Sequence, residues 1–211
     1  MLRIAERRGG VFIIRRDYST SSLYGSVRDS SVLIALLLHD IGKPLCYTED
    51  EKGGHFHGHG VFSSEIAEQV LDRLRFDGKT KAEVLELVLY HDSVIEPTKK
   101  TVRRWLNKLG EERFYQLLEV RMADILAHRI GTQGSRIERC EKLRILCDEI
   151  LDEQSCFTLK DMELKGNDLI DLGVPEGKEI GQILHQLLEE VMDGKLENRR
   201  QALLKRAKEL I

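Results

Sequence analysis

The chain has 211 residues, with 33 Lys and Arg against 36 Asp and Glu, which gives a formal net charge of −3. This balance excludes a protein that binds polyanions through an overall positive charge. The longest apolar run covers only seven residues, 32–38. Such a run makes about 10 Å of helix and is too short to cross a membrane core of ~30 Å.

The four cysteines point to a reducing compartment. Cys46, Cys140, Cys147 and Cys156 show no Cys-x-x-Cys spacing, and four are too few to staple a chain of this length. The first residues carry no signal-peptide pattern. We therefore expect free thiols and a cytoplasmic location.

The N-terminal third contains one strong helix signal. Residues 1–30 are poorly patterned, apart from an apolar run at 11–14 that predicts a short strand. A helix is predicted over 32–40, with a serine just before it as the N-cap. Gly42-Lys43-Pro44 ends this helix, because proline cannot continue the helical hydrogen bonds.

Helical patterning continues to the end of the chain. The glycine-rich segment 47–60 predicts a loop, and Thr80 followed by Glu83 predicts a capping box. Apolar residues three and four apart predict the remaining helices. These cover 65–74, 81–91, 99–109, 111–128, 137–152 and 164–172, and one further helix is predicted on each side of Gly194. Since no strand-rich stretch follows residue 30, the sequence predicts an all-α fold.

Histidine and aspartate gather between residues 39 and 124 in a pattern typical of a metal site. Two His-Asp pairs lie at predicted helix ends, three histidines share the glycine-rich loop, and one aspartate lies among apolar helix residues. In chain order these are His39, Asp40, His55, His57, His59, His91, Asp92 and Asp124. A lone histidine on an apolar face is usually structural, but so many together favour a metal site. Imidazole and carboxylate ligands suit Mg, Mn, Ni, Co, Fe or Zn.

The same residues carry a family resemblance. Segment 36–44, Leu-Leu-Leu-His-Asp-Ile-Gly-Lys-Pro, resembles the signature of the HD superfamily of metal-dependent phosphohydrolases. Further segments resemble the HD domain and C-terminal helical region of bacterial CCA-adding tRNA nucleotidyltransferases. These segments are 55–59, 64–67, 71–76, 89–92, 100–110, 123–124, 166–170, 173–181 and 194–198. The resemblance implies an HD helical bundle over 31–130 and a smaller helical region over 131–211, after an N-terminal segment, 1–30.

The resemblance also implies roles for individual residues. Hydrolysis of a phosphoester, such as a 2′,3′-cyclic phosphate, on a nucleotide or an RNA end is the expected reaction, with Asp40 and Lys43 as catalytic residues. The implied metal ligands are His39, Asp40, His59, His91 and Asp124, with His55 and Asp92 as additional candidates. The alternative for His55 is a solvated loop residue without a metal, and the alternative for Asp92 is a simple helix-end carboxylate.

Two departures from the family pattern bear on activity. Full-length relatives carry an N-terminal nucleotidyltransferase head with an Asp-x-Asp motif. No such motif precedes His39, so we expect that the chain alone does not add CCA. HD proteins also bring a first histidine from about 20 residues upstream of the His-Asp pair, whereas here no histidine precedes His39. That ligand is missing, or is replaced by Asp17, a water molecule or a loop histidine.

Basic residues cluster locally despite the negative net charge. Lys100, Arg103 and Arg104 share one predicted helix. A solvated helix face is one interpretation, and a track for the tRNA backbone is the other, which the resemblance favours. Three hypotheses stay open: a stand-alone phosphohydrolase, a tRNA-binding body that works with a separate nucleotidyltransferase head, and an inactive fragment. The apolar stripe over 180–191 packs internally or against a second copy of the chain.

Overall fold

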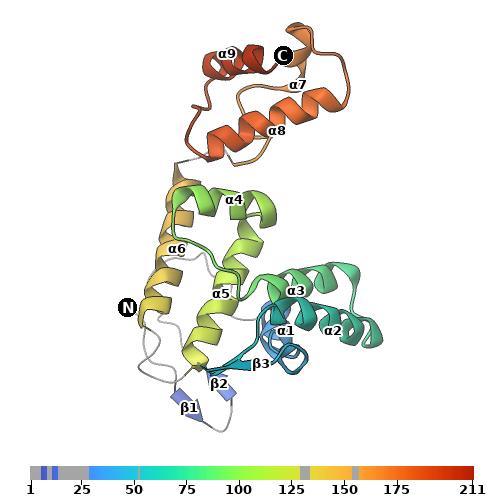
Figure 1. Cartoon of the computed structure of the whole chain (residues 1–211), viewed down its shortest axis with the longest axis vertical. Coiled ribbons are helices and arrows are strands. Elements are labelled where there is room, and N and C mark those ends of the chain that lie inside the picture. Colours follow the sequence, from blue (N-terminus) through green and yellow to red (C-terminus); the bar gives the residue numbers. More distant parts are fainter. Residues whose placement is uncertain (1–5, 9–10, 14–28, 52, 129–133, 154–156) are drawn as a thin grey trace. The chain divides into compact units, whose positions relative to one another are not determined.

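The computed structural model describes residues 6–8, 11–13, 29–51, 53–128, 134–153 and 157–211. Helices dominate this part of the chain, which confirms the predicted all-α fold (Figure 1). The α-helices are α1 (Ser30–Leu38), α2 (His59–Arg73), α3 (Gly78–Tyr90), α4 (Lys99–Leu109), α5 (Glu111–Ala127), α6 (Gly134–Asp152), α7 (Gly166–Asp171), α8 (Lys178–Met192) and α9 (Arg200–Leu210), with one short 3-10 turn, η1 (Lys43–Leu45).

Two short antiparallel hairpins accompany the helices. β1 (Glu6–Arg8) pairs with β2 (Val11–Ile13), where the sequence predicted a strand. β3 (Thr48–Asp50) pairs with β4 (Gly53–His55) inside the segment predicted to be a loop. That prediction was wrong in this detail, because residues 48–50 are exposed and carry no alternating apolar pattern that would signal a strand.

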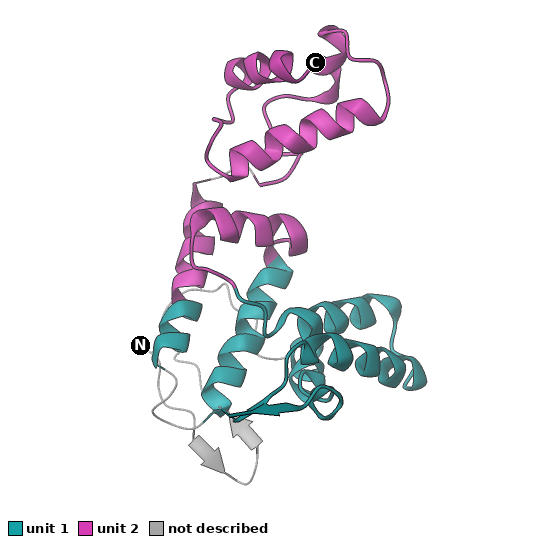
Figure 2. Ribbon diagram, viewed as in Figure 1, with its two compact units in different colours: residues 1–94, 112–140 teal, residues 95–111, 141–211 magenta. Residues whose placement is uncertain are grey.

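The chain forms two compact units (Figure 2). Unit 1 contains residues 1–94 and 112–140, and unit 2 contains residues 95–111 and 141–211. Each unit is therefore built from separate stretches of the chain, with α5 and α6 running across the boundaries. The domain boundaries predicted after residues 30 and 130 stay predictions.

In unit 1, α1, α2 and α3 pack against one another, and α5 adds buried side chains such as Phe114 and Leu117. α1 has no charged side chain, and Val32, Ala35 and Leu38 on its inner face are buried. The cap of α1 is Asp29, whose carboxylate accepts a hydrogen bond from Ser31 N at 2.9 Å, so the predicted cap, Ser30 or Ser31, was one or two residues too late. Leu87 of α3 is fully buried in the same unit.

Glu83 ties three helices of unit 1 together instead of capping α3. The cap of α3 is Asp77, which accepts from Thr80 N, so the predicted capping box was wrong. Glu83 accepts a hydrogen bond from the Ser31 hydroxyl of α1 at 2.8 Å and pairs with Arg113 of α5 at 2.9 Å. Arg113 holds the pKa of the Glu83 carboxyl below its ordinary value of 4.5, despite the opposing effect of burial.

Replacing Glu83 with glutamine should destabilise unit 1 by about 2 kcal/mol at pH 7, because a charge-assisted contact is lost in a part-buried place. The pKa of Glu83 is lowered on folding, so its contribution is present above pH 4.5 and is lost as the pH falls through the folded value. Urea unfolding at pH 7 and pH 3 measures this. The matched control is Glu86→Gln on the same helix, 46% exposed and 3.3 Å from Arg113. Equal losses for the two variants would contradict the assignment.

Unit 2 has an apolar core of its own. α7, α8 and α9 bury a cluster of side chains that includes Leu169, Leu187 and Leu203, each 0% exposed. The stripe predicted over 180–191 packs into this cluster through Ile183, Leu187 and Val191. In the part of the chain that the structure describes, no helix is both long and apolar enough to cross a membrane.

Candidate metal centre

The first two ligand candidates on α1 are placed by a tight turn against α2. His39 is the C-cap of α1, and Asp40 follows it. Gly42 then touches α2 so closely that an added Cβ would lie 2.4 Å from Ser63 N, and Gly42 N donates to the Ser63 hydroxyl at 2.9 Å. A side chain at position 42 would push the turn off α2. The glycine after the His-Asp pair therefore fixes where these two side chains point.

Four helices, α1, α2, α3 and α5, bring the predicted ligands together around Asp40. Its carboxylate lies 3.3 Å from His39 Nε2, 3.4 Å from His59 Nε2 and 3.8 Å from His91 Nε2. Ligand atoms of His39, Asp40 and His91 all lie within 4.8 Å of one another. Asp124 of α5 flanks this group, with Oδ1 3.5 Å from His39 Nε2. The five residues His39, Asp40, His59, His91 and Asp124, predicted as ligands, form what we call the inner cluster.

The three histidines of the inner cluster are oriented in the same way. Each Nδ1 lies against the backbone carbonyl three residues earlier: His39 at 2.9 Å from Leu36 O, His59 at 2.9 Å from Phe56 O and His91 at 2.7 Å from Val88 O. A carbonyl oxygen only accepts, so each Nδ1 carries the proton. In the neutral rings, every Nε2 therefore presents a lone pair to the centre, as metal-ligating histidines do.

Two observations show that the inner cluster fits a cation. The Nε2 atoms of His59 and His91 lie 2.9 Å apart, so two lone pairs face each other unless a proton or a cation lies beside them. Among the described residues, His39 Nε2 and Asp40 Oδ1 are buried and have no hydrogen-bond partner. Buried polar atoms of this kind are normally satisfied. A divalent ion bound by imidazole nitrogen and carboxylate oxygen would satisfy them.

The charges of the cluster reinforce one another. Burial lowers the pKa of His39, but the nearby carboxylates of Asp124 and Asp40, 3.5 and 3.3 Å from its Nε2, outweigh this effect and raise that pKa to about 10. Burial raises the pKa of the Asp40 carboxyl, but the neighbouring imidazoles and the Lys43 ammonium hold it well below its ordinary value. Without an ion, a proton on His39 Nε2 thus balances the two carboxylates, and a metal ion bound at this point would take the place of that proton.

The remaining predicted site residues lie around the inner cluster. Lys43 Nζ is 2.6 Å from Asp40 Oδ2 and lies over the Phe56 ring. Asp92 is 67% exposed, with Oδ2 3.9 Å from His59 Nδ1, so it faces the protonated side of that ring. His55 pairs with Asp50 on the β3–β4 hairpin at 3.0 Å and lies outside the inner cluster. Asp17 lies outside the described residues.

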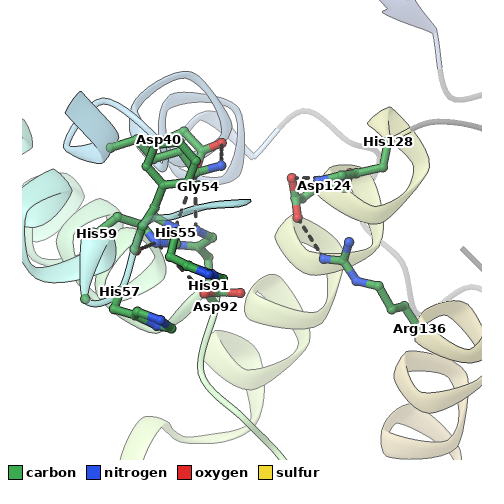
Figure 3. A pocket seen from close by; sticks show the side chains of 13 residues that line it. Asp40, Gly54, His55, His57, His59, His91, Asp92, Asp124, His128 and Arg136 are labelled. Carbon is green, nitrogen blue, oxygen red and sulfur yellow. Dashed lines mark hydrogen bonds and ion pairs between the residues drawn. The ribbon is translucent and has the colours of Figure 1, made fainter. Parts of the chain in front are cut away.

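A pocket of about 350 Å³ opens over the inner cluster (Figure 3). Two of its lining residues, His128 and Arg136, were missed from the sequence. Both lie next to Asp124, with His128 Nδ1 at 3.6 Å and Arg136 Nη2 at 3.3 Å. His128 is four residues after Asp124 and so shares its helix face, a spacing that would have found it. Arg136 comes from α6, and no local pattern links it to Asp124.

The predicted RNA-binding residues lie in unit 2 and are engaged with acidic side chains. Lys100 pairs with Asp193 at 2.9 Å, and Arg104 pairs with both Asp193 and Glu189, at 2.9 and 3.1 Å. Arg103 lies beside them on α4. These ion pairs join α4 to α8 and partly neutralise the basic face.

Fold and site together define an all-helical protein with a candidate divalent-metal centre. The family model for tRNA nucleotidyltransferase domain 2 matches residues 61–207. The chain therefore belongs to the tRNA nucleotidyltransferase family. It is 31% identical over 172 residues to the CC-adding tRNA nucleotidyltransferase of Thermus thermophilus, covering 80% of this chain and 38% of that protein.

A second relative gives nearly the same result. The chain is 30% identical over 170 residues to the A-adding tRNA nucleotidyltransferase of Deinococcus radiodurans, covering 76% of this chain and 38% of that protein. The chain thus spans well under half the length of the curated relatives it matches. No solved structure matches the chain.

Proposed function

We propose that the chain is a divalent-metal-dependent phosphohydrolase that acts in the cytoplasm on phosphoesters of nucleotides or RNA ends, including 2′,3′-cyclic phosphates. One observation carries the proposal: the Nε2 atoms of three histidines lie within 3.8 Å of the Asp40 carboxylate, while His39 Nε2 and Asp40 Oδ1 are buried without a hydrogen-bond partner. An ion bound at this point would polarise a phosphoryl oxygen and lower the pKa of its bound water to about 7.

In this proposal the residues of the chain divide the work. The inner cluster would hold the ion through His39, Asp40, His59, His91 and Asp124. Lys43 and Arg136 line the pocket as cations, so they are placed to attract the negative charge of a phosphate. Arg136, whose side chain is 45% exposed, is able to present a planar guanidinium to phosphate oxygens.

The proposal is tested by hydrolysis of bis(p-nitrophenyl) phosphate and of 2′,3′-cyclic AMP. The purified chain is assayed with Mg, Mn, Ni, Co, Fe or Zn ions, each with and without excess EDTA. We expect turnover with at least one ion and its loss in EDTA. Absence of turnover with every ion, in a folded chain that binds the ion, would reject the hydrolase and favour the second function below.

The second candidate function is that of a non-catalytic tRNA-binding body that works with a nucleotidyltransferase head supplied by another chain. The match to domain 2 and the coverage of 38% of each relative favour it.

For this second function, the Lys100→Ala/Arg104→Ala variant should bind tRNA about tenfold more weakly, and its salt slope should fall by about 2, one for each lost phosphate contact. An electrophoretic shift at several salt concentrations measures both. The matched control is Arg73→Ala/Lys79→Ala, which removes the same two charges from the exposed end of α2 and start of α3. If both variants bind tRNA more weakly to the same extent, the attraction of tRNA is general and does not depend on a defined basic surface on α4. Arg103→Ala tests the third predicted contact.

A further inference from the structure

Arg121 of α5 connects the inner cluster to the end of α3. Its Nη1 donates one hydrogen bond to His91 O at 2.9 Å and another to Ser93 O at 2.6 Å. The last carbonyls of a helix have no partner within that helix and sit at the negative end of its dipole. A guanidinium at this position satisfies them and matches their charge.

The ligand His91 is thereby held at two points. Its ring is fixed by the hydrogen bond from Nδ1 to Val88 O at 2.7 Å, and its backbone carbonyl is fixed by Arg121. His91 is only 6% exposed. Its Nε2 therefore has little freedom to move away from Asp40 and His59.

The position of Arg121 along α5 gives this contact a second consequence. Asp124 lies three residues later, one helical turn along, so both side chains project from the same side of α5. One helix therefore supplies a ligand candidate, Asp124, and also holds the ligand that α3 supplies.

A largely buried guanidinium at this place loses hydration of its positive charge, which is unfavourable for folding. Burial lowers the pKa of Arg121, against the nearby negative charges of Asp92 and Asp124. Arginine stays charged in proteins, so its charge needs partners. Ordinary packing of α5 against α3 would not require such a group.

We propose that Arg121 is a positioning residue, which holds His91 Nε2 in the geometry that binds the divalent ion. This inference rests on the metal site of the proposed function. Partners that orient a metal ligand typically change metal affinity by about 10- to 100-fold when they are removed. Arg121 is expected to act in this range without touching the ion or the substrate.

The test is a titration of the metal-free chain with Co²⁺, in which the visible absorption bands of the bound ion are recorded as the signal. Arg121→Met should weaken Co²⁺ binding by about 10- to 100-fold and change the band shape. Arg121→Lys keeps a charge that reaches one carbonyl, so its affinity should lie between those of Arg121→Met and the wild type. If Arg121→Met does not fold, the affinity of the lysine variant still tests the proposal.

The matched control is Arg113→Met. It removes another part-buried arginine from α5, one that contacts Glu83 and not the inner cluster. It should lower stability but leave the Co²⁺ affinity and spectrum unchanged. If wild type binds Co²⁺ and folded Arg121 variants bind it equally well with the same spectrum, the positioning role is wrong while the metal site stands. If the wild type binds no Co²⁺, both the metal site and the inference fail.

Discussion

Replacing Asp40 with alanine is expected to slow phosphoester hydrolysis by about 1000-fold, equivalent to ~4 kcal/mol in the activation barrier. The Asp40 carboxylate lies within 3.8 Å of three imidazole nitrogens, and it is the only carboxylate in the described part of the chain with that position. Its removal takes away a ligand and also the one carboxylate that lies close to all three imidazoles. Initial rates at saturating metal measure the effect.

The control for this experiment is Asp72→Ala. Asp72 is a 60% exposed aspartate of α2 that pairs with Lys81 and does not line the pocket. It should hydrolyse at the wild-type rate. Wild-type activity in Asp40→Ala would mean that the observed hydrolysis comes from elsewhere in the protein or from a contaminant, and it would remove the basis of the proposed function.

Removal of the metal ion is expected to lower the thermal stability of the chain. An ion that binds the folded state only, at 100 times its dissociation constant, should add about 2.7 kcal/mol to the free energy of unfolding. For a chain of this size that raises the melting temperature by roughly 5–10 °C. Excess EDTA should reverse the increase. Differential scanning calorimetry is suited to this measurement, since it shows whether one or both units respond.

The shift should be confined to unit 1, because every residue of the inner cluster lies in that unit. Asp40→Ala should melt at the same temperature with and without the ion. A wild-type melting temperature that is identical in EDTA and in each of the six ions would contradict the metal site. A shift of equal size in Asp40→Ala would place the ion elsewhere.

The inner cluster was predictable because its residues sit at places that local sequence defines. His39 and His91 are each the C-cap of a helix, and the apolar helix and Gly42 mark the first of these ends. Asp124 is a carboxylate among apolar residues, which needs a partner. The all-α fold followed from the same periodic patterns. Local sequence thus predicted which residues gather, although it did not predict their distances.

The contacts that were missed are those between residues far apart in the chain. Glu83 satisfies the spacing of a capping box, but its carboxylate is taken by Arg113, and Asp77 caps the helix instead. Arg121 and Arg136 reach the site from α5 and α6, and no spacing rule connects them to their partners. Asp193 similarly neutralises Lys100 and Arg104 from the end of α8. Such pairs depend on tertiary packing, which periodicity does not contain.

We propose that His39, Asp40, His59, His91 and Asp124 bind a divalent metal ion. The most direct test is equilibrium dialysis of the chain against Co²⁺, Mn²⁺ or Zn²⁺, with the bound metal counted by mass spectrometry. We expect at least one bound ion per wild-type chain, and only a small fraction of that in Asp40→Ala. A wild-type chain that binds none of these ions, or an Asp40→Ala variant that binds them equally well, would contradict it.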